Sequence, residues 1–164
     1  MINLGISADT SEFACDSLKL WWDHVGCHRY PEANCLLILA DSGGSNSYRH
    51  HIFKDSLQML SNSIGIEIRV AHYPPYTSKW NPIEHRLFPH VTRAMSGVIF
   101  RNIELVQELI ENTTTKNGLK VTTNIIDKIY EKGKKASEDL YKRGTIILDK
   151  VIGTLNYKIK PMSH

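Results

Sequence analysis

The sequence has little that would favour a membrane, secreted or zinc-stabilised protein. Its 164 residues contain no apolar run near the ~20 residues of a transmembrane helix, and no charged-then-apolar leader precedes Asn3. The three cysteines, Cys15, Cys27 and Cys35, cannot all pair with one another and show no CxxC spacing. Reduced thiols and the absence of a zinc site are the simplest explanation. We therefore expect a cytoplasmic protein that does not enter a membrane.

The charge is nearly balanced overall but unevenly distributed. Lys and Arg number 20 against 17 Asp and Glu, and basic residues exceed acidic ones only in residues 101–164. All histidines except His164 lie before residue 100. A His-rich part followed by a Lys-rich part fits a cation site combined with a surface for polyanions. A solvated, Lys-rich helical tail explains the same charge pattern.

The order of hydrophobic patterns predicts one α/β domain, since strand and helix patterns alternate. The run 35–40 is apolar at every position, which indicates a strand covered on both faces. The expected strands are 3–7, 35–40 and 66–72, and the expected helices are 9–25, ending at Gly26, 52–64, ending at Gly65, 81–95 and 103–113. Beyond residue 118 we expect a strand at 119–122, a Lys- and Glu-rich helix near 136–143 and an extended end at 157–159.

Asp41 follows the apolar strand directly and opens a Gly-Gly loop. The carboxyl ends of strands in open α/β sheets form ligand-binding crevices, where a carboxylate can hold a divalent cation such as Mg²⁺. The alternative is that Asp41 or Ser45 caps the next helix. A phosphate-binding P-loop is excluded, because no Lys-Ser/Thr follows the glycines at the required spacing.

Glu84 lies three residues after Asn81, which is the spacing of a capping box at a helix start. If strands 35–40 and 66–72 are neighbours, Asp41 and Glu84 open at one edge of the sheet. Paired carboxylates there could bind two cations for phosphodiester chemistry. Side chains suited to phosphates or to an unpaired base surround Glu84, namely Lys79, Trp80, His85 and Arg86. For Trp80, a place in the core is the alternative.

Two long motifs carry a family resemblance. Leu37-Ile-Leu-Ala-Asp-Ser-Gly-Gly-Ser-Asn46 and His72-Tyr-Pro-Pro-Tyr-Thr-Ser-Lys-Trp-Asn-Pro-Ile-Glu-His-Arg-Leu-Phe88 resemble DDE transposases of bacterial insertion sequences, in the Rhodopirellula-type (IS-Azo) branch. The resemblance implies an RNase H-like domain in which three acidic residues bind two Mg²⁺ (or Mn²⁺) ions for DNA strand nicking and transfer. By motif, Asp41 is similar to the second acid and Glu84 to the third. The candidate DNA contacts are then Lys79, Trp80, Asn81, His85 and Arg86.

The resemblance also implies parts that this chain is expected to lack. In the family the first acid lies on the first strand, upstream of the motif that begins at Asp9, so we expect the first two strands and that acid to be missing. What remains would be a partial RNase H-like core at 1–100, with a three-stranded, mainly parallel sheet flanked by helices. Residues 101–164 would form a helical and extended, Lys-rich C-terminal extension. If strand 3–7 lies beside 35–40, Asp9 becomes a candidate substitute metal ligand; otherwise Asp9 is a helix cap.

The leading interpretation is the C-terminal catalytic portion of a DDE transposase, whose intact form performs Mg²⁺-dependent DNA strand cleavage and transfer. We expect this chain to be a truncated remnant with weak or no activity. Its partners would be DNA, at the element ends and the target, and a second copy of itself. Two alternatives remain: a non-catalytic DNA-binding or assembly module, and a Mg²⁺-dependent nuclease.

Overall fold

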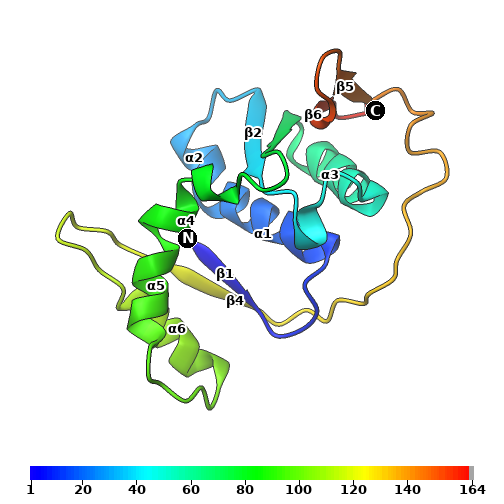
Figure 1. The fold of residues 1–164 in the computed structure, drawn as a ribbon. Helices are drawn as coiled ribbons and strands as arrows, with labels where there is room; N and C mark the ends of the chain where they lie inside the picture. The colour runs from blue at the N-terminus through cyan, green and yellow to red at the C-terminus, as the bar shows by residue number, and fades with distance from the viewer. Residues whose placement is uncertain (163–164) are drawn as a thin grey trace. The chain divides into compact units, whose positions relative to one another are not determined.

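The computed structural model describes residues 1–162, and backbone contacts divide them into two units built from separate stretches of chain (Figure 1). One unit joins Met1–Ala8 to Tyr76–Ile129, and the other joins Asp9–Pro75 to the chain from Tyr130 onward. No helix within residues 1–162 combines the length and the apolar character needed to span a bilayer. The domain division at residue 100 stays a prediction.

The larger unit contains a mixed sheet with the strand order β2-β3-β6-β5. β2 (Cys35–Ala40) and β3 (Glu67–His72) are parallel, whereas β6 (Gly153–Ile159) runs antiparallel to β3 and β5 (Ile146–Asp149) antiparallel to β6. The expected three-stranded, mainly parallel sheet is therefore wrong. A C-terminal hairpin adds two antiparallel strands to β3, and only its second strand showed a sequence signal.

The helix that begins this unit runs further than its sequence pattern predicts. α1 (Ser11–Trp21) continues through a π-helical turn, η1 (Trp22–Gly26), into the short α2 (Cys27–Arg29). Gly26 has helical dihedrals and does not end the helix. A Cβ at this position would lie 2.6 Å from Cε3 of Trp22, so glycine is needed there for close packing with the indole.

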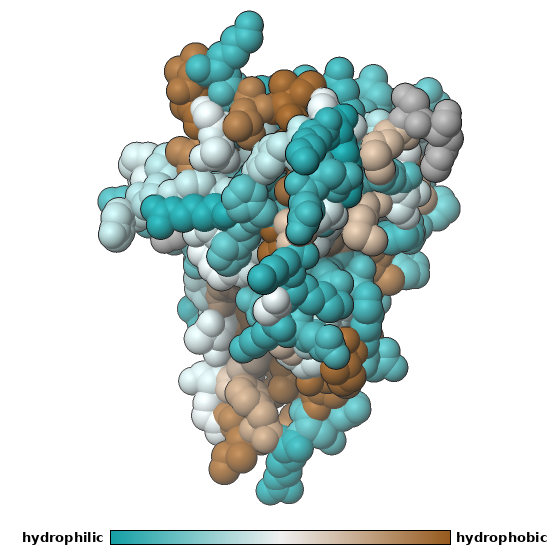
Figure 2. Space-filling view, turned by 90° about the vertical axis from the view of Figure 1, so that its right-hand side faces the viewer, coloured by the Kyte–Doolittle hydropathy of each residue, from teal (hydrophilic) through white to brown (hydrophobic). Residues whose placement is uncertain are grey.

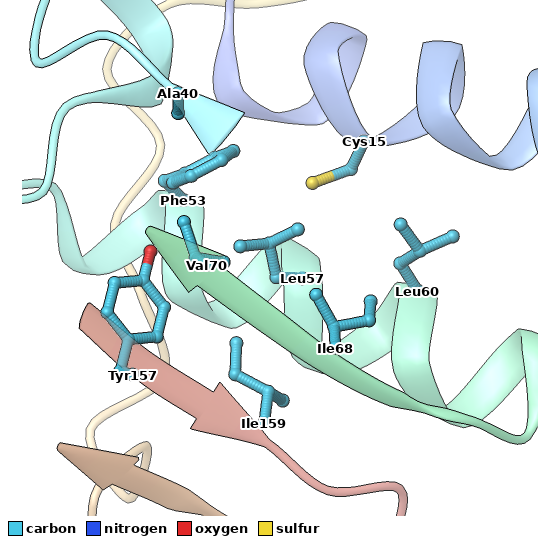
Figure 3. Packing of buried hydrophobic residues seen from close by; sticks show 9 residues of the cluster. All are labelled: Cys15, Ala40, Phe53, Leu57, Leu60, Ile68, Val70, Tyr157 and Ile159. Carbon is cyan, nitrogen blue, oxygen red and sulfur yellow. The ribbon is translucent and has the colours of Figure 1, made fainter. Parts of the chain in front are cut away.

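The core of the larger unit lies where α1 and α3 (His51–Ile64) pack against one face of the sheet. α3 ends at Gly65 as expected, since this glycine takes the left-handed conformation, with φ of 74°. Apolar residues from all these elements interdigitate in the core (Figure 3): Cys15, Ala40, Phe53, Leu57, Leu60, Ile68, Val70, Tyr157 and Ile159. Each large side chain buried here contributes about 1.5–3 kcal/mol to folding.

The opposite face of β2 is open, contrary to the expectation of a strand covered on both faces. Leu37 and Leu39 are 56% and 55% exposed, whereas Ala40 is buried. β2 also lies at the edge of its sheet. An unbroken apolar run therefore identifies the strand correctly but does not determine how many of its faces are covered.

The smaller unit contains a parallel sheet of two strands, one from each of its two stretches of chain. β1 (Ile2–Gly5) pairs with β4 (Thr123–Ile126). The arrangement of strand 3–7 beside 35–40, on which the candidacy of Asp9 as a substitute ligand depended, is therefore not formed. β4 starts later than the expected strand 119–122. The helices α5 (Phe88–Met95) and α6 (Ile103–Glu111) complete this unit, whose core is centred on Val91, Ile110 and Val121.

The helix expected over residues 81–95 is divided in two. α4 (Ile83–Arg86) and α5 are separated at Leu87, which has the non-helical dihedrals φ −122° and ψ −58°. Pro89 follows in the first turn of α5. Because proline has no N–H and restricts the residue before it, it is tolerated at a helix start but not inside a continuous helix.

The Lys- and Glu-rich helix expected near 136–143 does not form; these residues make turns that return the chain to α3. Asp55 of α3 accepts hydrogen bonds from the backbone N–H and the hydroxyl of Ser137, at 2.8 and 2.7 Å. Arg143 reaches the same carboxylate at 3.4 Å. This segment, orange at the right of Figure 1, belongs to the side viewed in Figure 2, where hydrophilic side chains predominate.

Candidate active site

Asp41 stands immediately after β2, at the carboxyl ends of two parallel strands. Ala40 is in register with His72, the last residue of β3. The chain then passes through Ser42 and Gly43 into the 3-10 turn η2 (Gly44–Asn46). The expected neighbourhood of strands 35–40 and 66–72 is confirmed, and Asp41 lies at their common edge.

Three consecutive residues around Asp41 are tied to the end of β3. The carbonyl of Ala40 accepts a hydrogen bond from the N–H of Tyr73 at 2.8 Å. The Asp41 carbonyl lies 3.3 Å from Nδ1 of His72, and Ser42 Oγ donates to the Tyr73 carbonyl at 2.5 Å. Within residues 1–162 the Asp41 carboxylate accepts no hydrogen bond and forms no ion pair, so its oxygens are available to a ligand.

Asp9 contacts the other end of the same loop. Its Oδ1 accepts a hydrogen bond from Ser45 Oγ at 2.7 Å, and Ser11 Oγ donates to the Ser45 carbonyl at 2.6 Å. The role of helix cap, which was the alternative for Asp9, belongs instead to Thr10, whose side chain accepts from the N–H of Phe13. Asp9 therefore fixes the loop that Asp41 opens.

Glu84 lies in the first turn of α4, within the smaller unit. Its N–H donates to the Asn81 carbonyl at 3.1 Å, but the Asn81 side chain accepts from the N–H of Ile83 instead, at 3.3 Å. The expected side-chain capping box is therefore not formed. The half-buried carboxylate of Glu84 has no hydrogen-bond or salt-bridge partner among the described residues.

The residues proposed to contact DNA surround Glu84 in sequence and are largely exposed. Trp80 is 66% exposed, which excludes the core alternative for this side chain. Lys79 Nζ lies 6.0 Å from the centre of the Trp80 ring, and the Lys79 carbonyl is hydrogen-bonded to Nε2 of His85. The 3-10 turn η3 (Ser78–Trp80) is thus linked to α4, and Arg86 is exposed at the end of that helix.

Asp41 and Glu84 belong to different units, and their pairing stays a prediction. In the part of the chain that the structure describes, no three His, Cys, Asp or Glu side chains form a cluster suited to a metal ion. Each of the two carboxylates is nevertheless half-buried and, within residues 1–162, neither accepts a hydrogen bond nor forms a salt bridge, and oxygen donors of this kind suit Mg²⁺ or Mn²⁺.

A buried polar group beneath Asp41 was not predicted from the sequence. His72 is 7% exposed, and its Nε2 lies 3.2 Å from the hydroxyl of Tyr157 on β6. Lys54 of α3 is 1% exposed, donates to the Tyr48 carbonyl and places Nζ 5.0 Å from the Tyr157 ring centre. Local periodicity gave no signal, since Lys54 falls beside the apolar stripe of its helix.

Burial accounts for the electrostatics of this group. It lowers the pKa of His72, and the positive charge of Lys54 adds to that shift. The hydrogen bond with the Asp41 carbonyl and the negative charge of the Asp41 carboxylate oppose it. Burial also lowers the pKa of Lys54 and raises the pKa of Tyr157. The neutral imidazole and the protonated phenol are therefore the favoured forms near neutral pH.

Comparison with known proteins gives one match. A family model described as Rhodopirellula transposase DDE domain matches residues 1–161. No curated protein and no solved structure matches the chain. The match includes both long motifs, with Asp41 and Glu84, and therefore supports the sequence resemblance over nearly the whole chain.

Proposed function

We propose a function for this chain, which belongs to the Rhodopirellula-type family of transposase DDE domains: it supplies two metal-binding carboxylates, Asp41 and Glu84, for DNA strand cleavage and transfer. The observation that carries the proposal is the position of Asp41. It lies at the carboxyl ends of the parallel pair β2–β3, and its carboxylate has no partner within residues 1–162. Ligands in α/β sheets bind at such ends.

Asp41 and Glu84 would hold Mg²⁺ or Mn²⁺ through carboxylate oxygens. The bound ions supply activation of a water or hydroxyl nucleophile and stabilisation of the leaving oxygen. Asp9 is a weaker candidate ligand, because β1 pairs with β4 and not with β2, and because Ser45 already donates to its Oδ1.

The exposed side chains near Glu84 would hold the DNA. Lys79 and Arg86 can neutralise phosphates, and His85 and the Asn81 amide can add hydrogen bonds to the backbone. Trp80 presents an indole on which an unpaired base can stack, an interaction worth about 1–3 kcal/mol per base. Together they form a DNA-contact segment at residues 79–86.

Mn²⁺ binding to the full chain tests the metal ligands, with free Mn²⁺ followed by electron paramagnetic resonance. We expect Asp41→Asn and Glu84→Gln each to weaken binding by roughly tenfold or more. Glu104→Gln is the matched control, because Glu104 lies in the first turn of α6 as Glu84 does in α4. Equal Mn²⁺ affinity for the wild type and all three variants would contradict the proposal.

Nicking of supercoiled DNA with Mg²⁺ or Mn²⁺ separates the function classes. Nicking that is lost in Glu84→Gln indicates an enzyme, and joined products distinguish strand transfer from hydrolysis by a nuclease. The exposed segment 79–86 favours a DNA-binding module as the second candidate. In that case DNA affinity falls with salt, depends on Lys79 and Arg86 but not on Lys120, and is unchanged by Glu84→Gln.

A further inference from the structure

We propose that His72 is a positioning residue for Asp41, acting through a hydrogen-bonded bridge from the Tyr157 hydroxyl to the Asp41 main-chain carbonyl. This inference rests on the proposed function, because it assigns a role in the metal site of Asp41. The bridge connects β6, the end of β3 and the residue after β2. It lies entirely within the larger unit.

The donors and acceptors of the bridge determine its direction. A carbonyl oxygen only accepts, so Nδ1 of His72 must carry the proton that is shared with Asp41. In the neutral imidazole Nε2 is then an acceptor, and the Tyr157 hydroxyl donates to it across 3.2 Å. Both ring nitrogens and the phenol are thereby satisfied, as buried polar groups require.

The imidazole is held in one orientation by the rings around it. The ring centre of His72 lies 6.1 Å from that of Tyr48, 6.3 Å from that of Phe53 and 5.7 Å from that of Tyr157. Figure 3 shows Phe53 and Tyr157 in this part of the core, with the Tyr157 hydroxyl directed toward the Ala40 side. Lys54, over the Tyr157 ring, is the charged group that faces the bridge from α3.

The bridge completes a set of contacts that immobilise the Asp41 backbone. The N–H of Tyr73 donates a hydrogen bond to the carbonyl of the residue before Asp41. The hydroxyl of Ser42, the residue after Asp41, donates to the Tyr73 carbonyl. Without the imidazole the Asp41 carbonyl itself would have no protein partner within the described chain. A carboxylate on a fixed backbone loses less conformational freedom when it binds a cation, so the bridge should increase metal affinity.

The alternative is that His72 serves only to fill the core. Two substitutions separate these roles, since the amide nitrogen of asparagine occupies the place of Nδ1 and that of glutamine the place of Nε2. His72→Asn keeps a donor for the Asp41 carbonyl but loses the hydrogen bond with the Tyr157 hydroxyl. His72→Gln keeps a hydrogen-bond partner for Tyr157 but loses the one to the Asp41 carbonyl. A packing role predicts either no difference in Mn²⁺ binding or weaker binding by His72→Asn, because asparagine is the smaller side chain and leaves the larger cavity.

The experiment compares Mn²⁺ affinity and thermal unfolding of the full chain. We expect His72→Asn to bind Mn²⁺ within about threefold of the wild type and His72→Gln to bind roughly tenfold more weakly, as for other groups that orient metal ligands. Both variants should unfold at a lower temperature. Equal Mn²⁺ affinities for the two variants, or stronger binding by His72→Gln, would overturn the inference.

A second measurement does not depend on metal or on these variants folding. ¹⁵N spectra of histidine-labelled protein should show His72 as the Nδ1–H tautomer, and Tyr157→Phe should reduce that preference because it removes the donor to Nε2. A predominant Nε2–H tautomer in the wild type overturns the bridge. If the Nδ1–H tautomer is found but Asp41→Asn leaves Mn²⁺ affinity unchanged, the proposed function fails while the bridge stands.

Discussion

Replacing Asp55 with alanine should release the segment around residues 131–145 from α3. The carboxylate accepts from the N–H and the hydroxyl of Ser137 at 2.8 and 2.7 Å, and it is the acceptor for both. A hydrogen bond to a charged group contributes about 1.5–3 kcal/mol, and the freed Ser137 groups can regain water, so we take the lower value for each bond. The expected loss is then about 3 kcal/mol of unfolding free energy.

Urea denaturation followed by circular dichroism measures this loss, and limited proteolysis at the lysines of the segment reports its release. The matched control is Asp139→Ala. Asp139 also pairs with Arg143, through hydrogen bonds of 3.1 and 2.6 Å, but its side chain is 57% exposed, and among the described residues its carboxylate accepts no hydrogen bond from Ser137. Because solvent screens this exposed ion pair, the control should lose much less stability than Asp55→Ala. Equal stability of Asp55→Ala and Asp139→Ala would refute the reasoning.

Three further substitutions have defined outcomes in the same unfolding assay. Hydrogen bonds from Thr123 lower the pKa of Glu111 below its ordinary 4.5; this stabilisation is present above pH 4.5 and is lost as the pH falls through the lower native value. Glu111→Gln should therefore be less stable than the wild type at pH 7 and differ less from it in acid; a constant difference contradicts this. Gly26→Ala should cost about 1–3 kcal/mol, because its Cβ would meet Trp22, and an unchanged midpoint would contradict that contact. Leu57→Ala should cost about 2–5 kcal/mol, against less than about 0.5 for Met59→Ala on the exposed face of α3; similar losses would count against the assigned core.

The sequence predicts a helix or strand correctly where residues of that same element determine its pattern and its end. α3 ends at Gly65 because that residue takes a left-handed conformation, and every second residue of β3 is buried. The exposed face of β2 could not be predicted, since an apolar run looks the same on one covered face or two. The segment 136–143 has residues common in helices, yet its conformation is determined by Asp55, more than 80 residues earlier.

The candidate site shows the same difference between local and distant information. The position of Asp41 at the end of a strand follows from local sequence, because the strand and the Gly-Gly loop adjoin it. The hydrogen bonds that hold the loop and the backbone of Asp41 do not follow from local sequence. Ser45 bonds to Asp9, and His72 to Tyr157, across segments that are distant in the chain. The burial of Lys54 could not be predicted either, because a charged residue beside the apolar stripe of a helix is usually solvated.

The claim that Asp41 and Glu84 act on the same ions can be tested by a double-mutant cycle on Mn²⁺ affinity. If each carboxylate holds a separate ion, the losses in Asp41→Asn and Glu84→Gln should add as free energies in the double variant. If the two share an ion, the second substitution should cost much less than the first, because residues that bind one partner are coupled by about 0.5–3 kcal/mol. A second double-mutant cycle, with Asp41→Asn and His72→Gln, gives the coupling energy of two residues in direct contact, to which the first cycle is compared. Coupling between Asp41 and Glu84 as strong as that between Asp41 and His72 supports a shared metal site, and strict additivity refutes it.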